Sequence, residues 1–509
     1  MRPASIEAVT TAGTAQIDDL ERGVTADRAF RPRLFVPPLV TLPLARPLKA
    51  VLARRRVRLA ASGPVPMLLL GLVIRLLLTP WTQGWDFNSY VQEAILTMHG
   101  QDVYVVAHAH DLLTWAYLPL CMDMFTGLGW LSSLTGLPFR VLAKLPTLLA
   151  DLGVAWLIFA SLRRHGRGER AALLGMSLYL FNPLVLYNGA VVGRFDSIAL
   201  VFLLLAIERF HARLFVPAYA LAIAAKTFPV FILPLLLFGR ERQKPSRLAL
   251  ACALVPVLSL PYSLTSIKAM IASLSYDVRT PWLGRLSWYI WPQDAHWLSP
   301  ARVLILARAG SLIYPAAILL LVVVARDKSL YLKVACALLL FVAFNRTVYE
   351  QYLLWPLPFL LILALADRDR DYLALGMVAL CTLTGLIENE QTWTPFDPRL
   401  HYAVLPTPFG PLNALLALAI VAFVAAEAGS RIHRARVRRR LRDVTGPRPV
   451  LGPVPAVPTP VLPGRVHRCG LADRGRSPRV RPTIGYCWRI AEGRLTGDAG
   501  RQDGGNRAY

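Results

Sequence analysis

The sequence has few charged residues for its length. Asp, Glu, Lys and Arg make up 17% of the 509 residues, whereas a typical soluble domain has roughly 25%. Hydrophobic residues make up 55%, and the mean hydropathy is +0.46. Apolar runs of about 17–25 residues recur along the chain, and each is long enough to cross a bilayer core of about 30 Å. The composition therefore excludes a water-soluble protein and predicts an integral membrane protein.

Paired cysteines, a signal peptide and nucleic-acid-reading motifs are also lacking. The six cysteines show neither the pattern of a disulfide framework nor the spacing of a zinc site. No small-residue cleavage site follows Arg54-Arg55-Arg56, so the first apolar run is expected to be an uncleaved transmembrane helix. The net charge of +25 is concentrated at the two ends of the chain. Basic flanks beside an apolar core favour contact with anionic membrane lipids, and no nucleic-acid partner is expected.

By composition, the chain divides into three parts. Residues 1–63 are basic, and residues 431–509 are basic and rich in Pro, Gly and Arg; both are expected to be disordered cytoplasmic segments. Residues 64–430 are expected to form an all-α transmembrane bundle of about 10–12 membrane segments. The sequence thus predicts a multi-pass protein of the cell membrane with both termini in the cytoplasm.

The distribution of Lys and Arg predicts which loops lie outside. The loops 163–170, 240–247 and 326–333 are basic and are expected to be cytoplasmic, whereas residues 81–139 contain five acidic residues and no Lys or Arg. Residues 81–139 are therefore expected to form the first extracytoplasmic loop. Polar residues collect in the expected outer loops, and solubility alone does not explain them. The outer face is therefore the expected location of the active site.

This orientation requires two apolar segments to begin and end on one side of the membrane. Residues 115–136 are expected to be interfacial or re-entrant, and residues 214–238 re-entrant with Lys226-Thr227 at the tip. Pro229 and Pro234 interrupt the second segment. A broken backbone at membrane depth is tolerated only where protein or a cavity covers it. The alternative for residues 214–238 is one kinked helix that crosses the membrane.

Four polar residues stand out near the expected outer ends of the helices. Asp86 follows the first apolar run, and a partly desolvated carboxylate there suits a general base or a helix N-cap. Arg194 suits a phosphate group, and Asp196 beside it is another N-cap candidate. Lys226 lies within an apolar segment, where a cation usually faces a partner or a cavity.

Other ionisable residues carry less specific signals. Arg346 and Glu350 form a second polar turn on the expected outer side. Arg75, Lys144 and Asp151 lie within or near apolar runs and are expected to pair inside the bundle. The residue types of His108, His110 and Asp111 are those of metal ligands, but their spacing is a weak signal. No metal site is assigned, and a divalent metal cofactor is left open.

Several short runs, in this order and spacing, resemble the GT-C membrane glycosyltransferases that take a sugar from a polyprenyl-phosphate carrier. The resemblance covers about residues 64–430 and is greatest to bacterial polyprenyl-phosphate-mannose-dependent α-mannosyltransferases, and looser to GPI mannosyltransferase I. The runs are Trp85–Phe87, Lys144–Asp151, Asn182–Leu184, Gly193–Ser197, Ala225–Pro229, Leu233-Pro234 and Glu350–Pro358.

The resemblance implies transfer of a hexose, with mannose expected, from a polyprenyl-phosphate donor to a lipid or glycan acceptor. It implies that Asp86 is the catalytic residue, because the family has an acidic residue at that place in the first outer loop. Asn88 stands where some members have the second Asp of an Asp-x-Asp pair, and members often have Gln where Arg194 stands.

The chemistry of such a transfer assigns roles to the other candidates. A phosphate leaving group needs no general acid, so one base is enough for an inverting displacement, and cations must hold the developing phosphate charge. We expect Lys226, Arg346 and Arg194 to bind the donor phosphate. The residues expected to bind substrate are Asn88, Asp196, Glu350, Gln351 and Tyr352.

Two other classes of protein remain as alternatives. A secondary transporter or lipid flippase also uses broken helices and buried charges, but it would favour two matched halves, and the sequence has no internal repeat. A catalytically inactive assembly or lipid-binding subunit is the second alternative. The sequence does not specify the sugar, the acceptor or the linkage.

Overall fold

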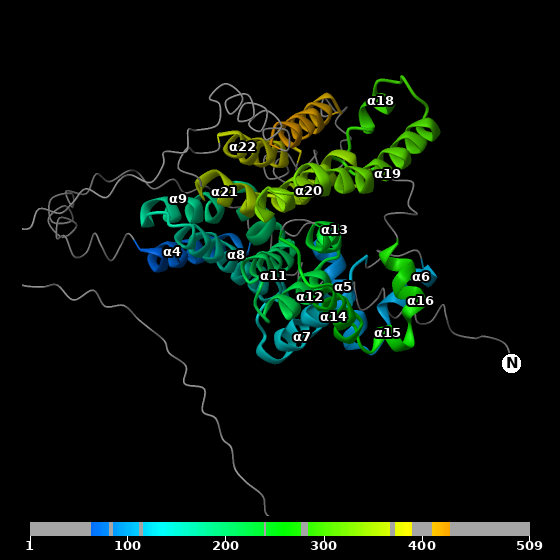
Figure 1. Ribbon diagram of the computed structural model, residues 1–509. Coiled ribbons are helices and arrows are strands. Elements are labelled where there is room, and N and C mark those ends of the chain that lie inside the picture. Colours follow the sequence, from blue (N-terminus) through cyan, green and yellow to red (C-terminus); the bar gives the residue numbers. More distant parts are fainter. Residues whose placement is uncertain are drawn as a thin grey trace, which may run out of the picture. The chain divides into compact units, whose positions relative to one another are not determined.

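The computed structural model describes residues 63–80, 85–110, 116–238, 241–275, 283–366, 372–388 and 410–427. Every regular element within these ranges is a helix (Figure 1), so the expected all-α fold class is confirmed for the described part of the chain. The terminal segments that were expected to be disordered lie outside these ranges, except for Gly63.

Three helices are long and apolar enough to cross a membrane. They are α8 (Phe139–Arg164), α19 (Pro300–Val324) and the helix Gly410–Glu427. The helix α9 (Glu169–Leu180) and the segment Pro183–Val192 would make a fourth span, bent by 46°. The other apolar helices of the described ranges are 10–17 residues long. Membrane-spanning helices are therefore supported by length and composition, while their total number and orientation stay predictions.

The helix α8 is the centre of the packing. It contacts α4 (Pro64–Leu78), α7 (Pro119–Thr135), α9, α11 (Asp196–Glu208) and α21 (Leu357–Ala366). The remaining longer helices are α5 (Trp85–Met98), α6 (Val103–His110), α12 (Phe215–Ala225), α14 (Pro245–Leu258), α16 (Ile267–Leu274), α20 (Leu330–Phe344) and α22 (Tyr372–Ile387). Shorter elements are α10 (Pro183–Leu186), α13 (Leu233–Leu237), α15 (Tyr262–Thr265) and α18 (Ile290–Asp294).

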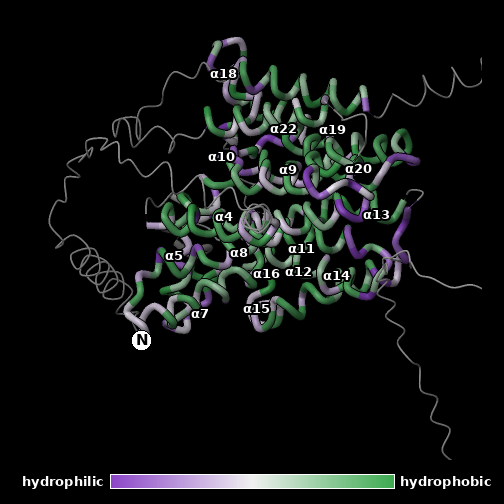
Figure 2. Tube along the Cα trace, turned by 90° about the vertical axis from the view of Figure 1, so that its left-hand side faces the viewer, coloured by the Kyte–Doolittle hydropathy of each residue, from purple (hydrophilic) through white to green (hydrophobic). Residues whose placement is uncertain are grey.

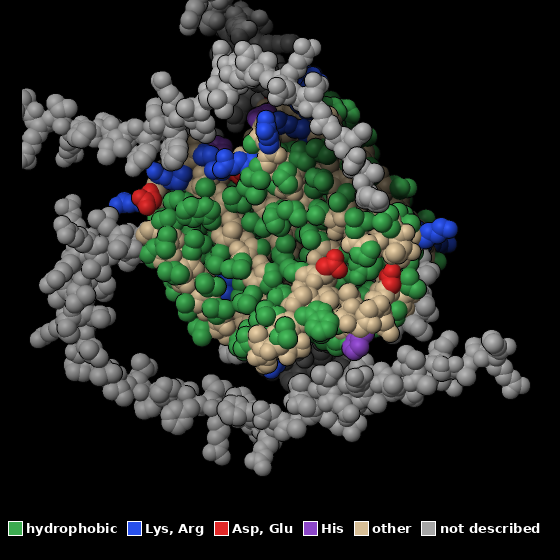
Figure 3. Space-filling model, turned by 90° about the horizontal axis from the view of Figure 1, so that it is seen from below, with side chains coloured by type: hydrophobic (Ala, Val, Ile, Leu, Met, Phe, Trp, Pro, Cys, Tyr) green, Lys and Arg blue, Asp and Glu red, His purple; other side chains and the backbone are tan. Residues whose placement is uncertain are grey.

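Apolar side chains cover much of the outside as well as the core. On α19 the exposed residues include Ile305, Leu312 and Leu319, which recur at intervals of seven and so lie along one face of the helix. Figure 3 shows a broad hydrophobic face with Lys and Arg gathered along one edge. In Figure 2, hydrophobic residues dominate the helices, and hydrophilic residues gather in connecting segments, for example beside α13. This distribution suits helices that face lipid.

The interruption expected at Lys226-Thr227 is present. The helix α12 ends at Ala225, Lys226 is extended (φ −158°, ψ 139°), and a 3₁₀ helix, η2 (Phe228–Ile232), follows. Pro229 has no backbone N–H to continue the α-helical ladder, which explains why the helix does not resume at once. The break is thus confirmed, whereas its re-entrant course through a membrane stays a prediction.

Candidate functional site

Three irregular helical segments bring the predicted site residues together. The π-helix η1 (Tyr187–Val192) leads through Gly193 into α11, η2 follows Lys226, and the 3₁₀ helix η3 (Glu350–Leu354) precedes α21. The helices α11 and α12 pack against each other, and both η2 and η3 contact α20. Side chains that lie far apart in the sequence therefore converge where regular helices are interrupted.

Lys226 and Asp196 form a buried ion pair. Lys226 Nζ donates to Asp196 Oδ1 at 2.7 Å, and Trp355 Nε1 donates to the same oxygen at 2.6 Å. Lys226 is 4% exposed and Asp196 2%. The N-cap interpretation of Asp196 is wrong, because Phe195 is the N-cap of α11 and the Asp196 carboxylate is engaged by Lys226 instead. Its position in the first turn still places the negative charge at the positive end of the helix dipole.

An aromatic cage surrounds the ammonium group of Lys226. Nζ lies 5.2–5.9 Å from the centroids of four rings, those of Tyr117, Phe195, Tyr352 and Trp355. Tyr352 stacks on Trp355 with centroids 4.2 Å apart. Such contacts stabilise a desolvated cation by about 0.5–2 kcal/mol each. Only Tyr352 was predicted as a site residue. Phe195 stands beside Asp196 and Trp355 in the Glu350–Pro358 run, whereas nothing in the sequence marks Tyr117.

Both partners of this ion pair retain unused hydrogen-bonding capacity. A lysine ammonium has three N–H donors, and within the described ranges its one hydrogen-bond acceptor is Asp196. Asp196 Oδ2 is buried and accepts no hydrogen bond from any residue that the structure describes. A ligand with both acceptor and donor groups could satisfy the two residues together.

Arg194 and Glu350 form a second buried pair. Arg194 Nη1 donates to Glu350 Oε1 at 2.6 Å and to Asn188 Oδ1 at 3.1 Å. Gly193 before it has a left-handed φ of +84°, and a Cβ there would lie 3.0 Å from side-chain atoms of Lys144 and Phe87. Glycine is therefore required at this turn by both conformation and space. Asn188 was not predicted, because a single Asn in an apolar run gives no sign of its partner.

Arg346 and Gln351 lie in or next to the turn that carries Glu350. Arg346 and Gln351 are each 4% exposed, and Gln351 Oε1 accepts no hydrogen bond among the described residues. The turn is held by residues 284–286, since Gly284 N donates to Arg346 O at 2.8 Å and Leu286 N donates to Val348 O at 2.9 Å. The predicted residues of this turn are thus buried and held close to Arg194 through Glu350.

A third ionic contact is joined to the site through Ser197, the residue after Asp196. Arg75 Nε is 3.1 Å from Asp151 Oδ2, and Ser197 Oγ donates to Asp151 Oδ1 at 2.5 Å. The expected pairing of Arg75 and Asp151 inside the bundle is confirmed. Lys144 donates to the backbone carbonyls of Thr79 and Val191, at 3.0 and 2.6 Å. Lys144 thereby joins the ends of α4 and η1.

Asp86 lies in the first turn of α5, and its side chain, like that of Asn88, is outside the described part of the structure. Phe87 between them is described: its ring centroid is 5.7 Å from Lys144 Nζ, and it adjoins Gly193. The first turn of α5 therefore lies against the segment that leads to Arg194 and Asp196.

The metal interpretation gains no support from the described residues. The side chains of His108 and His110, and the whole of Asp111, lie outside them. No group of three or more His, Cys, Asp or Glu that could hold a metal ion occurs within the described ranges.

A further buried carboxyl adjoins the site at the end of α22. Glu388 is 0% exposed, both of its oxygens lack hydrogen bonds to the described part of the chain, and Oε2 is 4.0 Å from Arg285 Nε. Burial raises the pKa of Glu388 to about 8; Arg285 opposes the rise, and the negative charge of Glu350 adds to it. The neutral form of this carboxyl is therefore favoured at neutral pH.

No protein-family model matches the chain, and a comparison with curated proteins found no match. The resemblance to GT-C glycosyltransferases accordingly continues to rest on the short runs in the sequence.

Proposed function

We propose that the chain is an integral membrane glycosyltransferase that moves a hexose, with mannose as the first candidate, from a polyprenyl-phosphate carrier to a lipid or glycan acceptor. The observation that carries the proposal is the Lys226–Asp196 pair in its aromatic cage. Lys226 has N–H donors for a phosphate oxygen, and Asp196 Oδ2 can accept from a sugar hydroxyl. A phosphate-linked sugar offers both groups at adjacent positions.

In the proposed reaction Asp86 is the only base. Its carboxylate takes the proton from the acceptor hydroxyl, whose oxygen attacks the anomeric carbon of the sugar. The bond from that carbon to the phosphate oxygen breaks, and the phosphate keeps the electron pair, so the configuration inverts. Lys226 and Arg346, together with Arg194, hold the phosphate charge in a site shielded from water.

The other predicted residues would orient the sugar. Asp196 and Glu350 have carboxylate oxygens for sugar hydroxyls, and Gln351 Oε1 is an unused acceptor. The ring of Tyr352, which forms one wall of the cage, provides an apolar face for the sugar ring. Asn88 would contact substrate from the first turn of α5.

Replacing Asp86 by Asn tests the catalytic assignment. With purified protein and labelled polyprenyl-phosphate mannose, Asp86→Asn should lower sugar transfer by about 10²–10⁴-fold, the usual contribution of a general base. Asp123→Asn is the matched control, because Asp123 is an exposed acid on α7 in the same predicted outer loop. The unfolding temperature should be unchanged in both variants, and full activity of Asp86→Asn would overturn the assignment.

A second assay distinguishes the glycosyltransferase from the alternative function, a secondary transporter or lipid flippase. Broken helices such as α12–η2 also occur in transporters. Proteoliposomes that contain an acceptor should therefore be tested both for uptake or flipping of the labelled lipid and for labelled acceptor product. Translocation without any labelled acceptor product would replace the glycosyltransferase proposal.

A further inference from the structure

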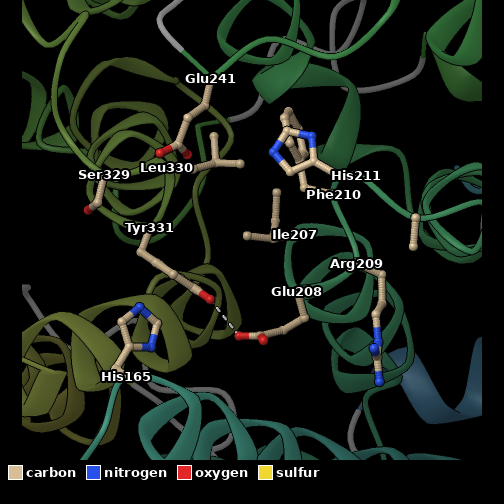
Figure 4. Close-up of a pocket in the computed structure, with 11 residues that line it drawn as sticks. His165, Ile207, Glu208, Arg209, Phe210, His211, Glu241, Ser329, Leu330 and Tyr331 are labelled. Carbon is tan, nitrogen blue, oxygen red and sulfur yellow. Dashed lines mark hydrogen bonds between the residues drawn. The ribbon is translucent and has the colours of Figure 1, made fainter. Parts of the chain in front are cut away.

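A separate pocket lies at the other end of α11 from the site. Asp196 is the first residue of α11 and Glu208 the last, so they lie about 18 Å apart along the helix axis. The pocket has a volume of about 450 Å³ and is bounded by the ends of α8 and α11, the turn after α11 and the start of α20 (Figure 4). The mechanism proposed above uses none of its residues.

The acidic residues of this pocket are largely neutralised by protein groups. Tyr331 OH donates to Glu208 Oε1 at 2.6 Å, as Figure 4 shows, and Arg164 forms an ion pair with Glu208. Glu241, the other acid of the lining, interacts electrostatically with Lys333. Neither carboxylate is therefore a strong attraction for a cationic ligand.

The cationic groups, in contrast, have capacity left. Arg209 lines the pocket and makes no side-chain hydrogen bond or ion pair within the described ranges, and its charge repels that of Arg164. His165 and His211 stand on opposite sides of the cavity (Figure 4). Lys333, next to the lining residues of α20, is 1% exposed, and among the described residues its Nζ has an electrostatic interaction with Glu241 but no hydrogen-bond partner. An anion in the pocket would relieve the repulsion between the two guanidinium groups.

The start of α20 adds a backbone contribution. Ser329 is its N-cap and accepts from Leu332 N at 3.3 Å, and Ser329, Leu330 and Tyr331 all line the pocket. The helix is 15 residues long, so its N-terminus carries an appreciable positive partial charge. A helix N-terminus, an unpaired arginine and two imidazoles around one cavity form a typical environment for phosphate.

We propose that this pocket binds a phosphate group, carried either by an anionic lipid headgroup or by a soluble phosphate compound. Its location agrees with the first source, because the basic loops 163–170, 240–247 and 326–333 meet here. Such loops favour the cytoplasmic side, where anionic headgroups are found. The pocket would then be occupied on the side of the membrane opposite to the proposed reaction.

Binding can be tested with Arg209→Gln, and Arg213→Gln is the matched control. Both residues are exposed and belong to the same turn, but only Arg209 lines the pocket. The purified full chain in uncharged detergent is titrated with inorganic phosphate, with chloride at equal ionic strength as the comparison. The unfolding temperature is measured at each concentration. In a second arm, native mass spectrometry measures retention of phosphatidylglycerol against phosphatidylcholine.

Wild type and Arg213→Gln should respond alike, and Arg209→Gln should bind about tenfold more weakly, the usual loss of a charge-assisted hydrogen bond. A response to lipid alone identifies a headgroup site, and a response to inorganic phosphate alone identifies a soluble ligand. His211→Gln, also at an exposed residue, is a second variant that should weaken binding. No response in either arm, or equal binding by Arg209→Gln and Arg213→Gln, would overturn the proposal.

Discussion

Replacing Lys226 by Met should destabilise the fold through the charge that it leaves behind. Asp196 would remain 2% exposed with a hydrogen bond from Trp355 to one oxygen and none to the other. Removing one partner of a buried ion pair typically costs about 3–5 kcal/mol. We expect a loss of that size in the free energy of unfolding, since the burial of both residues prevents water from compensating.

Asp196→Asn should cost less. The amide oxygen can still accept from Lys226 and Trp355, so the loss is expected to be about 2–3 kcal/mol, within the range for a hydrogen bond to a charged group and its desolvated partner. The double variant, Lys226→Met with Asp196→Asn, removes both charges together. It should therefore be more stable than the sum of the single losses predicts, with a coupling energy of at least about 2 kcal/mol.

These free energies are measured by titrating the protein in mixed micelles with a denaturing detergent. The sugar-transfer assay is run on the same samples. Lys268→Met, at an exposed lysine on α16, is the control for loss of a lysine as such. The double variant should recover stability relative to Lys226→Met but not transfer activity, because the N–H donors for phosphate are gone. Additive losses would refute the coupling, and wild-type activity of Lys226→Met would refute its role at the phosphate.

Two further changes test parts of the structure around the site. Glu388 has a pKa of about 8 in the fold against 4.5 for the free side chain, so its stabilising contribution is complete below pH 4.5 and is lost as the pH rises through 8. Glu388→Gln should remove up to roughly 4–5 kcal/mol of that pH dependence; parallel stability curves for the two proteins between pH 5 and 9 would contradict this. Gly284→Ala should cost about 2 kcal/mol or more in unfolding free energy, because its Cβ would lie 2.1 Å from Val348 N. Gly376→Ala, in open space on α22, should be neutral or stabilising by about 1 kcal/mol; equal effects of the two glycine changes would contradict the packing of residues 284–286 on the turn.

The helical fold and its main interruption could be predicted because both depend on local properties of the chain. Apolar runs such as Phe139–Arg164 and Pro300–Val324 are long enough to be recognised by composition. Pro229 favours an interruption because it lacks an N–H donor, although Pro146 and Pro315 lie within the continuous helices α8 and α19. The number of spans could not be settled in this way, since helices of 10–17 residues are shorter than a typical crossing.

The pairing of the site residues could not be predicted because it depends on contacts between distant segments. Arg194 and Glu350 are 156 positions apart, and Lys226 and Asp196 are 30 apart. The local pattern at Asp196 indicated an N-cap, and this was wrong because the competing partner, Lys226, lies in the break after α12. Trp355 could have been suspected from its place beside Tyr352, but an aromatic residue in an apolar run is more often part of the core.

The ion pairs of the site suggest how a bound phosphate could replace Asp196 as the partner of Lys226. Residues 194–197 supply one partner to each of three buried contacts: Arg194 to Glu350, Asp196 to Lys226, and Ser197 to Asp151. A phosphodiester carries one negative charge, and in the proposed site it would compete with the Asp196 carboxylate for the ammonium group of Lys226. As Lys226 turned toward the phosphate, Asp196 would be released to accept a sugar hydroxyl, and this one movement of Lys226 would couple recognition of the phosphate to recognition of the sugar.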